Sequence, residues 1–392
     1  MMKSKAVYFP NLDGLRFFCF LSVLLFHSFA TDNRGIKGNP IYEVIKYRLF
    51  GNGELGVNFF FVLSGFLITY LLLKEKSQTG KVDVKKFYVR RILRIWPLYY
   101  VCLVIGFMIF PVIKLFLGVP ASEPARPLYY IFLVSNFDII HHLPDSSQLS
   151  ILWSKEVEEQ FYLAWPVIVG SSSRKVLPYV LLTIISGSLV FRLFNSTHPD
   201  VIKYHTISCV SDMAVGGCAA YFSIYSKRFL WSMKWMNSFA LAFIYSGGFI
   251  IYLFRHEIFF GIGLAFDRLV ISLFFALIIV EQNYSANSYF KMKNLVGPSL
   301  MGQYTYGLYC FSPIGILSAH IVLSKLGWNN TLVGLIVLEG VLSLAVTIFL
   351  AVFSYHFIEK RFLELKEHFA VVKTMPIVKK EIGLAEKQNV EQ

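Results

Sequence analysis

Long apolar segments are the feature that most constrains the fold of this 392-residue chain. A membrane helix needs about 20 mainly apolar residues, and about ten segments meet that requirement. They lie near residues 14–31, 55–73, 95–117, 151–170, 176–194, 206–225, 236–254, 258–281, 296–321 and 332–357. Because backbone polar groups in a bilayer must be paired within the protein, the sequence predicts an all-α fold, a polytopic bundle of about ten transmembrane helices.

Composition supports this class. The chain is 56% hydrophobic and only 16% charged, whereas soluble domains are about 25% charged. Lys and Arg number 37 against 24 Asp and Glu. Since the cytoplasmic loops of membrane proteins collect Lys and Arg, this excess does not indicate nucleic acid, and we expect no nucleic-acid partner.

The basic residues also orient the bundle. With the N-terminus inside, most Lys and Arg fall in the loops predicted to face inward, so both termini are expected in the cytoplasm. Residues 128–140 are apolar but short, which favours a re-entrant or interfacial piece, with an eleventh span as the alternative. We expect residues 1–363 to form the membrane bundle and residues 364–392 a polar, Lys- and Glu-rich cytoplasmic tail, partly disordered, with no second soluble domain.

Two ionisable residues interrupt the first apolar segment. Arg16 and His27 lie eleven positions apart, which is close to three helical turns, so they share one face about 16 Å apart. Ionisable side chains inside a membrane usually mark a functional interior. The alternative is an arginine that reaches the membrane surface and a histidine satisfied by a neighbouring helix.

A basic cluster precedes the third span. Arg90, Arg91 and Arg94 occur in RRILR, and guanidinium groups bind phosphate oxygens well. The alternative is a positive-inside anchor that contacts lipid headgroups.

Carboxylates open the fourth span. Glu158 and Glu159 are followed by aromatic residues, which indicates that they lie below the outer membrane surface, whereas Glu156 can equally be solvated. A carboxylate near an imidazole fixes its tautomer and raises its basicity. Because His27 is predicted on the same outer side, Glu158 or Glu159 with His27 forms a candidate catalytic pair.

Other residues were assigned structural roles. Gly56 and Gly65, with Ser64, are expected to form a face for close helix packing. The sequence allows His356 and Glu359 to cap the helix or to pair with the arginine cluster, and a structural ion pair is the favoured interpretation. The five cysteines show no metal-ligand spacing, so no metal is expected.

These motifs together resemble acyltransferase family 3, the bacterial integral-membrane O-acyltransferases. The matching stretches are LDGLRFF with His27 downstream, GVNFFFVLSGFL, RRILRIWPLYY, LWSKEVEEQFYLAWP, SDMAVGG and SYHFIEKRF, in family order from about residue 10 to 364. The resemblance implies transfer of an acyl group, usually acetyl, from cytoplasmic acyl-CoA to a hydroxyl of a cell-surface or lipid-linked glycan. It also implies a multi-pass location in the inner membrane of a bacterium, in contact with membrane lipid.

Site residues follow from the same resemblance. It makes Arg16 the motif arginine, His27 the essential histidine and Glu158 and Glu159 the motif acids. It associates Arg90, Arg91 and Arg94 with the co-substrate, acyl-CoA, in most members acetyl-CoA.

Three positions depart from the family pattern. Lys155-Glu156-Val157-Glu158-Glu159 stands where the family often has Leu-Ser-Val-Glu-Glu. Val210 stands where an arginine often lies two residues before the residue matched by Asp212, and Ser312 stands where many members have a histidine.

The expected mechanism has the arginines hold the phosphates of CoA. His27 acts as general base or as nucleophile, and Glu158 or Glu159 orients it. Two other classes of function stay open: a transporter or flippase of a lipid-linked saccharide, and a non-catalytic subunit in which His27 senses pH. The identity of the acceptor and the oligomeric state are not defined by the sequence.

Overall fold

The structure is a computed structural model that describes residues 7–116, 118, 120 and 122–372. Within these residues the chain is mostly helical and contains no β-strand. The predicted all-α class is therefore confirmed.

Eight helices in the described part of the chain are long and apolar enough to cross a membrane. They are Leu55–Thr79 (α4), Val84–Phe116 (α5, Val84–Val104, and α6, Phe110–Phe116), Leu177–Phe194 (α11), Thr206–Tyr225 (α13), Ser238–Ile258 (α15), Gly261–Tyr284 (containing α16, Leu264–Tyr284), Val296–Leu326 (α17, Val296–Met301, and α18, Thr305–Leu326) and Gly334–Glu367 (α19, Glu339–Ser354, and α20, Lys360–Glu367).

The two other predicted spans are also helical, but they are less typical of membrane helices. Helix α1, Asn11–His27, has 17 residues, which is short for a span. Helix α10, Trp153–Ser171, carries charged side chains in its first two turns, including Lys155 and Glu158. Residues 128–140 do not form an additional span, because they fold into the short helices α7, Pro127–Ile131, and α8, Ser135–Asp138.

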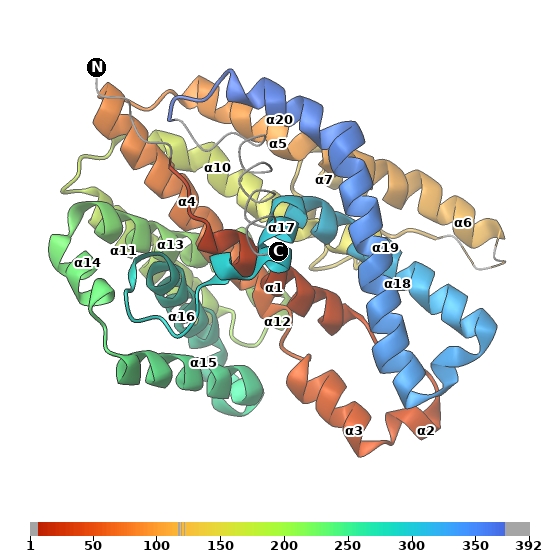
Figure 1. Cartoon of the computed structure of the whole chain (residues 1–392). Coiled ribbons are helices and arrows are strands. Elements are labelled where there is room, and N and C mark those ends of the chain that lie inside the picture. The colour runs from red at the N-terminus through yellow and green to blue at the C-terminus, as the bar shows by residue number, and fades with distance from the viewer. Residues whose placement is uncertain (1–6, 117, 119, 121, 373–392) are drawn as a thin grey trace, which may run out of the picture.

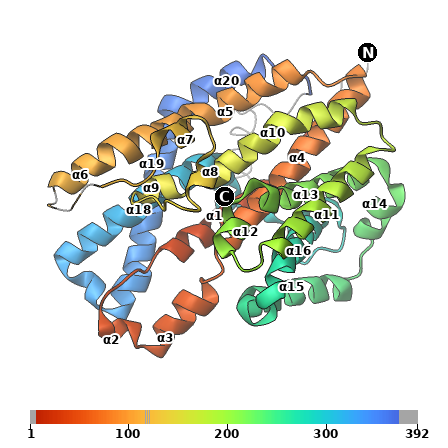
Figure 2. The ribbon, with the colours of Figure 1, turned by 180° about the vertical axis from the view of Figure 1, so that it is seen from behind.

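Helix α1 lies between two groups of helices (Figures 1 and 2). Helices α4, α11, α13 and α16 gather on one side of it, and α18 and α19 pack together on the other. Helix α5 runs beside α20, and α10 contacts both α4 and α5. Together these helices surround a space that one face of α1 borders.

Glycines set the closest helix contact. A Cβ atom on Gly65 of α4 would lie 1.9 Å from the carbonyl oxygen of Met213, and one on Gly216 of α13 would lie 2.0 Å from that of Val62. The backbones of α4 and α13 therefore touch where any side chain would clash. Gly56 similarly packs on the Cys19 carbonyl of α1, with a Cβ separation of 2.4 Å, so the predicted packing role of Gly56 and Gly65 is confirmed.

The corner between α4 and α5 positions the basic cluster. Helix α4 ends at Gly80, whose φ of 77° is left-handed, a conformation that glycine adopts without strain. The Asp83 side chain then caps α5 by accepting a hydrogen bond of 3.0 Å from the Lys86 amide. This tight corner brings the end of α4 beside the start of α5.

The predicted tail begins inside a helix. The boundary expected at residue 363 falls within α20, and residues 368–372 continue from it. The rest of the predicted tail, 373–392, lies outside the described residues.

Candidate active site

A cavity of about 370 Å³ lies among α1, α4, α5, α10, α18 and the segment from α20 to Val372. Along α4 its wall extends from Phe60 to Glu75, a length of about 22 Å at 1.5 Å per residue. One end is marked by Glu75 and the other by Phe60. In the predicted orientation of α4, from the outer side inward, the Glu75 end is the inner, cytoplasmic end of the cavity and the Phe60 end is its outer end.

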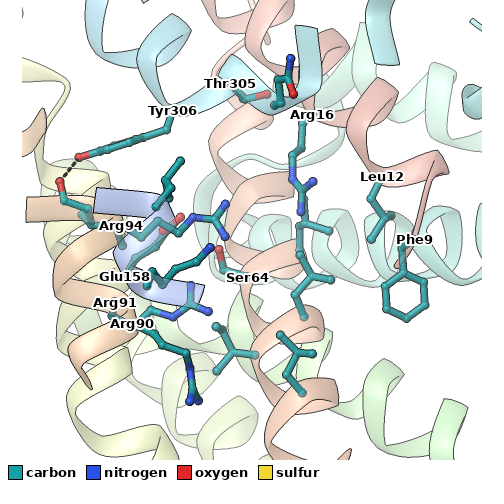
Figure 3. A pocket seen from close by; sticks show the side chains of 18 of the residues that line it. Phe9, Leu12, Arg16, Ser64, Arg90, Arg91, Arg94, Glu158, Thr305 and Tyr306 are labelled. Carbon is teal, nitrogen blue, oxygen red and sulfur yellow. Dashed lines mark hydrogen bonds between the residues drawn. The ribbon is translucent and has the colours of Figure 1, made fainter. Parts of the chain in front are cut away.

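The cavity gathers the predicted arginines. Arg16 reaches it from α1, and Arg90, Arg91 and Arg94 reach it from α5 on the opposite side (Figure 3). Glu158 of α10 lines the same space. Five of the residues singled out in the sequence thus meet in one place, although they come from three helices.

Two of these arginines are ion-paired. Arg16 Nη1 lies 2.6 Å from Asp13 Oδ1, one turn earlier on α1. Arg90 Nη2 lies 3.3 Å from Glu75 Oε2, and Arg90 Nη1 donates a 2.8 Å hydrogen bond to the carbonyl oxygen of Phe369. The segment after α20 is therefore attached to the inner end of the cavity.

The other two arginines keep unused hydrogen-bond donors. Arg91 Nε is buried and has no hydrogen-bond partner in the part of the chain that the structure describes. Its guanidinium lies over the rings of Phe87 and Tyr162, 5.5 and 5.2 Å from their centroids. Arg94 is exposed along the cavity, and among the described residues it forms no hydrogen bond or ion pair. An anion with several oxygens, such as a phosphate, would satisfy these donors.

Lys155 is a cavity residue that the site prediction missed. Its Nζ lies 3.2 Å from Glu158 Oε1, while the Tyr162 hydroxyl donates a 3.2 Å hydrogen bond to Glu158 Oε2. The ammonium also lies 5.7 Å from the centroid of the Phe60 ring, which places it at the outer end of the cavity. The available signal was the departure from the family pattern at this position.

Glu159 and Glu156 point elsewhere. Glu159 does not line the cavity; its Oε2 accepts a 3.1 Å hydrogen bond from Trp96 Nε1, and its Oε1 is buried without a partner. Glu156 is fully buried and accepts hydrogen bonds from the Tyr99 hydroxyl and the Asn136 amide at 2.6 and 3.0 Å. A solvated Glu156 is therefore excluded in this structure.

His27 ends α1 outside the cavity wall. Its ring is exposed and packs edge-on against Phe26, 4.9 Å between centroids. Within the described part of the chain it forms no hydrogen bond, so none joins it to Glu158 or Glu159. The charged groups that act on the imidazole through space are Lys203, Lys46 and Glu54.

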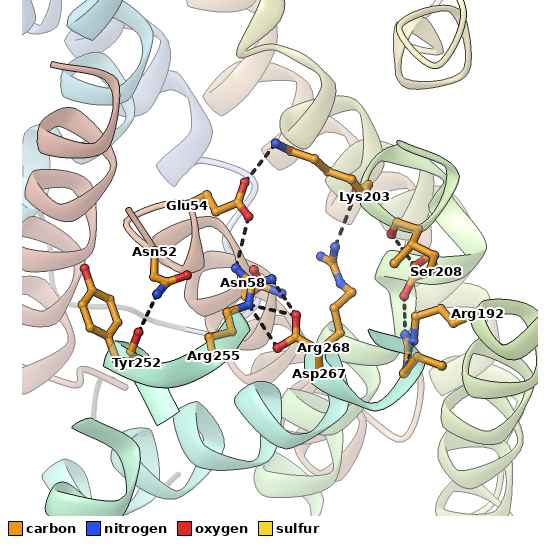
Figure 4. A network of polar contacts seen from close by, with 12 residues as sticks. Asn52, Glu54, Asn58, Arg192, Lys203, Ser208, Tyr252, Arg255, Asp267 and Arg268 are labelled. Atoms are coloured by element: carbon orange, nitrogen blue, oxygen red, sulfur yellow. Dashed lines mark hydrogen bonds and ion pairs between the residues drawn. The ribbon is translucent and has the colours of Figure 1, made fainter. Parts of the chain in front are cut away.

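Two of these residues, Glu54 and Lys203, belong to a second polar cluster (Figure 4). Glu54, which precedes α4, pairs with Lys203 of α12, Pro199–Tyr204, at 2.9 Å and with Arg255 of α15 at 3.1 Å. Arg255 also pairs with Asp267 of α16 at 2.6 Å. Burial would raise the pKa of Glu54, but the nearby charges of Lys203 and Arg255 outweigh it and lower the pKa to about 2.

A buried pair lies beside this cluster. Asp212 accepts hydrogen bonds from Arg268 and from Asn58, the latter at 3.1 Å. The sequence contains Val210 in place of the expected arginine, and Arg268 of α16 supplies the cation instead. The site prediction missed Arg268; the available signal was the Asp267-Arg268 pair inside an apolar span.

The expected ion pair at His356 and Glu359 is wrong. His356 Nδ1 lies 2.9 Å from the Val352 carbonyl oxygen, and Glu359 accepts a 3.3 Å hydrogen bond from the Ser354 hydroxyl. In the described chain neither residue forms an ion pair, and Glu359 lines the arginine cavity instead. No three His, Cys, Asp or Glu residues of the described chain are placed to hold a metal ion.

Comparison with known proteins gives a consistent picture. A family model described as an acyltransferase domain matches residues 9–356. The Bacillus subtilis (strain 168) protein named "Putative peptidoglycan O-acetyltransferase YrhL" is 26% identical over 385 residues, covering 90% of this chain and 54% of that protein.

Two further relatives match shorter regions. "O-acetyltransferase OatA" of Staphylococcus aureus (strain NCTC 8325 / PS 47) is 34% identical over 170 residues, 41% of this chain and 25% of that protein. "Peptidoglycan O-acetyltransferase OatA" of Listeria monocytogenes (serovar 1/2a, strain EGD-e) is 30% identical over 234 residues, 55% of this chain and 34% of that protein. The chain thus spans about half or less of the length of these relatives. No solved structure matches the chain.

Proposed function

The chain belongs to the acyltransferase domain family, acyltransferase family 3, and on that premise we propose that it moves an acetyl group from acetyl-CoA to a hydroxyl of a cell-surface glycan. Peptidoglycan is the favoured acceptor class, because two of the relatives described above carry it in their names. The proposed location is the inner membrane of a bacterium, with both termini in the cytoplasm.

The arginine cavity is the observation that carries this proposal. CoA is polyanionic, and the donors of Arg91 and Arg94 that have no partner among the described residues suit its phosphates. Arg90 and Lys366 add positive charge to the same wall. The extent of the cavity along α4, about 22 Å at 1.5 Å per residue, suits the extended pantetheine arm that links the phosphates of CoA to its thioester.

His27 is the proposed catalytic base. The acceptor oxygen attacks the thioester carbonyl carbon, the C–O bond forms and the C–S bond breaks. The hydroxyl proton passes to His27 and then to the departing thiolate, which leaves an ester and CoA. An acyl-His27 intermediate gives the same products in two steps.

The glutamates of α10 take supporting roles in this proposal. Glu158 belongs to the donor side, because it lines the cavity and holds Lys155. Glu159 supports α5 through its hydrogen bond from Trp96. On α1 the cavity wall ends at Arg16, eleven positions before His27, so the acyl group has to pass outward along α1 to reach His27.

The test uses the purified protein in lipid nanodiscs with acetyl-CoA and soluble disaccharide–peptide fragments of peptidoglycan. We expect acceptor-dependent release of the free CoA thiol and an added acetyl mass on the fragment by mass spectrometry. A flippase would move a lipid-linked saccharide without consuming acetyl-CoA. Folded protein that binds acetyl-CoA but never releases thiol in the presence of the fragment would therefore defeat the acyltransferase proposal.

A further inference from the structure

The corner that precedes α4 is packed directly on the last turn of α1. A Cβ on Gly53 would lie 2.2 Å from the carbonyl oxygen of Ser22 and 2.6 Å from Cβ of Phe26. The two segments are therefore in backbone contact immediately before His27. Glu54, the next residue along, is held at the His27 end of α1, away from the wall of the arginine cavity.

The Glu54 carboxylate is held in place from two sides. Arg255 Nη1 lies 3.1 Å from its Oε1, and Lys203 Nζ lies 2.9 Å from its Oε2. Arg255 is fixed in turn by Asp267 (Figure 4). Since a carboxylate has about four lone-pair sites and an ammonium has three donors, both Glu54 and Lys203 keep capacity for further hydrogen bonds.

The Glu54–Lys203 pair is accessible, unlike the neighbouring Arg268–Asp212 pair. The side chains of Lys203 and Glu54 are 41% and 29% exposed, whereas those of Arg268 and Asp212 are 8% and 0% exposed. The buried pair can only support the fold. The exposed pair can also meet a ligand.

The same end of α1 holds another cation. Lys46 Nζ donates hydrogen bonds to the carbonyl oxygens of Phe26 and Ser28, at 2.8 and 2.5 Å, on either side of His27. Lys46 is therefore fixed beside His27, and Glu54, which holds Lys203, follows the residue that packs against the same end of α1. The surroundings of His27 are rich in fixed hydrogen-bonding groups, as in sites that bind polar ligands.

We propose that Glu54 and Lys203 form the acceptor subsite, which holds a hydroxyl-bearing sugar ring with one hydroxyl against His27. Glu54 accepts a hydrogen bond from a neighbouring sugar hydroxyl, and Lys203 donates one to a sugar oxygen. Both are positioning residues, since they orient the acceptor and take no part in bond making. This inference rests on the proposed function and assigns the acceptor to the outer end of α1.

The test compares Glu54→Gln with the wild-type protein in two measurements. The first is the KM for the soluble peptidoglycan fragment, which we expect to rise about ten- to a hundredfold, the effect of losing a charged hydrogen bond. The Kd for acetyl-CoA should stay within twofold, because the donor cavity is separate. The second is binding of the fragment without acetyl-CoA, followed by saturation-transfer NMR, which should weaken equally.

A matched control separates this site from other surface charges. Glu257 is exposed and forms only a long ion pair of 3.9 Å with Arg48 on the same side of the protein. Glu257→Gln should leave both measurements unchanged. Unchanged acceptor KM and unchanged NMR binding in folded Glu54→Gln would overturn the proposal.

A purely structural ion pair makes a different prediction. If the pair is only structural, the double variant Glu54→Gln/Lys203→Met, which removes both charges together, should bind the acceptor normally. If the pair is the acceptor subsite, as we propose, the double variant should bind the acceptor as weakly as Glu54→Gln. If Glu54→Gln does not fold, Glu54→Asp decides in the same way, because it keeps the charge but withdraws the carboxylate. Acceptor binding that depends on Glu54, in a protein that never releases CoA thiol, would defeat the proposed function and leave the subsite standing.

Discussion

The guanidinium of Arg268 donates two hydrogen bonds to a single oxygen of Asp212, from Nε at 3.1 Å and from Nη2 at 2.8 Å. The two residues belong to α16 and α13, and both side chains are almost completely buried. Because Val210 leaves α13 without a cation of its own, the charge of Asp212 is balanced across the helix interface. This contact joins α13 to α16 beside the second polar cluster, which contains Glu54, Lys203 and Arg255.

Arg268→Met should therefore destabilise the protein. Removing one partner of a buried ion pair leaves an unpaired buried charge, and we expect a loss of about 3–5 kcal/mol in the free energy of unfolding. Denaturant unfolding in micelles measures it. Arg228→Met, at an exposed position on α14, Lys227–Lys234, is the control and should change stability by less than about 0.5 kcal/mol. Equal stability of both variants would show that the pair contributes nothing.

Gly65→Ala should disturb the contact between α4 and α13. The added methyl would lie 1.9 Å from the Met213 carbonyl oxygen, and overpacking of this kind costs about 1–3 kcal/mol or more. Gly187→Ala on α11 is the matched control, because a Cβ there meets nothing within 4 Å. Thermal unfolding should show a lower midpoint for the first variant alone. Matching midpoints would mean that the two helices can separate freely.

Arg94→Ala should weaken acetyl-CoA binding without a loss of stability. Arg94 has no partner in the described chain, so its removal leaves no protein charge unpaired. Loss of a charged hydrogen bond to phosphate is worth about 1.5–3 kcal/mol, so we expect the KM for acetyl-CoA to rise about ten- to a hundredfold, with kcat less affected.

The same assay distinguishes the other arginines. Arg90→Ala should also raise this KM, but with a cost in stability, because it leaves Glu75 unpaired. Arg361→Ala, exposed on α20, is the control. If the cluster serves only as a lipid anchor, the Arg90 and Arg94 variants will bind acetyl-CoA like the wild-type protein.

His27→Ala should abolish acetyl transfer while acetyl-CoA binding is kept. Loss of a general base lowers rate by about 10²–10⁴, and loss of a covalent step would lower it further. His27→Gln retains size and a hydrogen bond, so it separates packing from chemistry. His256→Gln, at an exposed position on α15, should transfer acetyl normally. Wild-type rates in His27→Gln would end the catalytic assignment.

Topology can be tested with introduced cysteines. Asp32→Cys lies in the segment predicted outside and Ser77→Cys in the segment predicted inside, and both positions are exposed. In intact cells, a thiol reagent that cannot cross the membrane should label the first variant and not the second. After the cells are opened, both should react. The reverse pattern would place the arginine cavity on the outer side.

The sequence was most informative about the helices themselves and about features set by residues close together along the chain. Apolar length predicted the helices, and small residues predicted the packing face at Gly56 and Gly65. The spacing in RRILR placed three cations on one element, so their shared cavity with Arg16 depended only on the placement of α1 across the cavity from α5.

Long-range pairings were not predictable in the same way. Arg268 and Asp212 are 56 positions apart, and no spacing rule connects them. Equal predicted depth suggested that His27 and Glu158 meet, but depth does not determine which neighbour a helix face turns toward. Glu158 faces the arginine cavity, whereas His27 lies at the end of α1 that contacts Gly53 and Lys46.

The hydrogen bond between Arg90 and the Phe369 carbonyl has a thermodynamic consequence. An anion that takes the Nη1 donor of Arg90 competes with residues 368–372, so the two equilibria are linked and the coupling is reciprocal. If a bound anion weakens the attachment of residues 368–372 by some factor, displacement of those residues strengthens anion binding by the same factor. The position of residues 368–372 can therefore report whether an anion occupies the cavity.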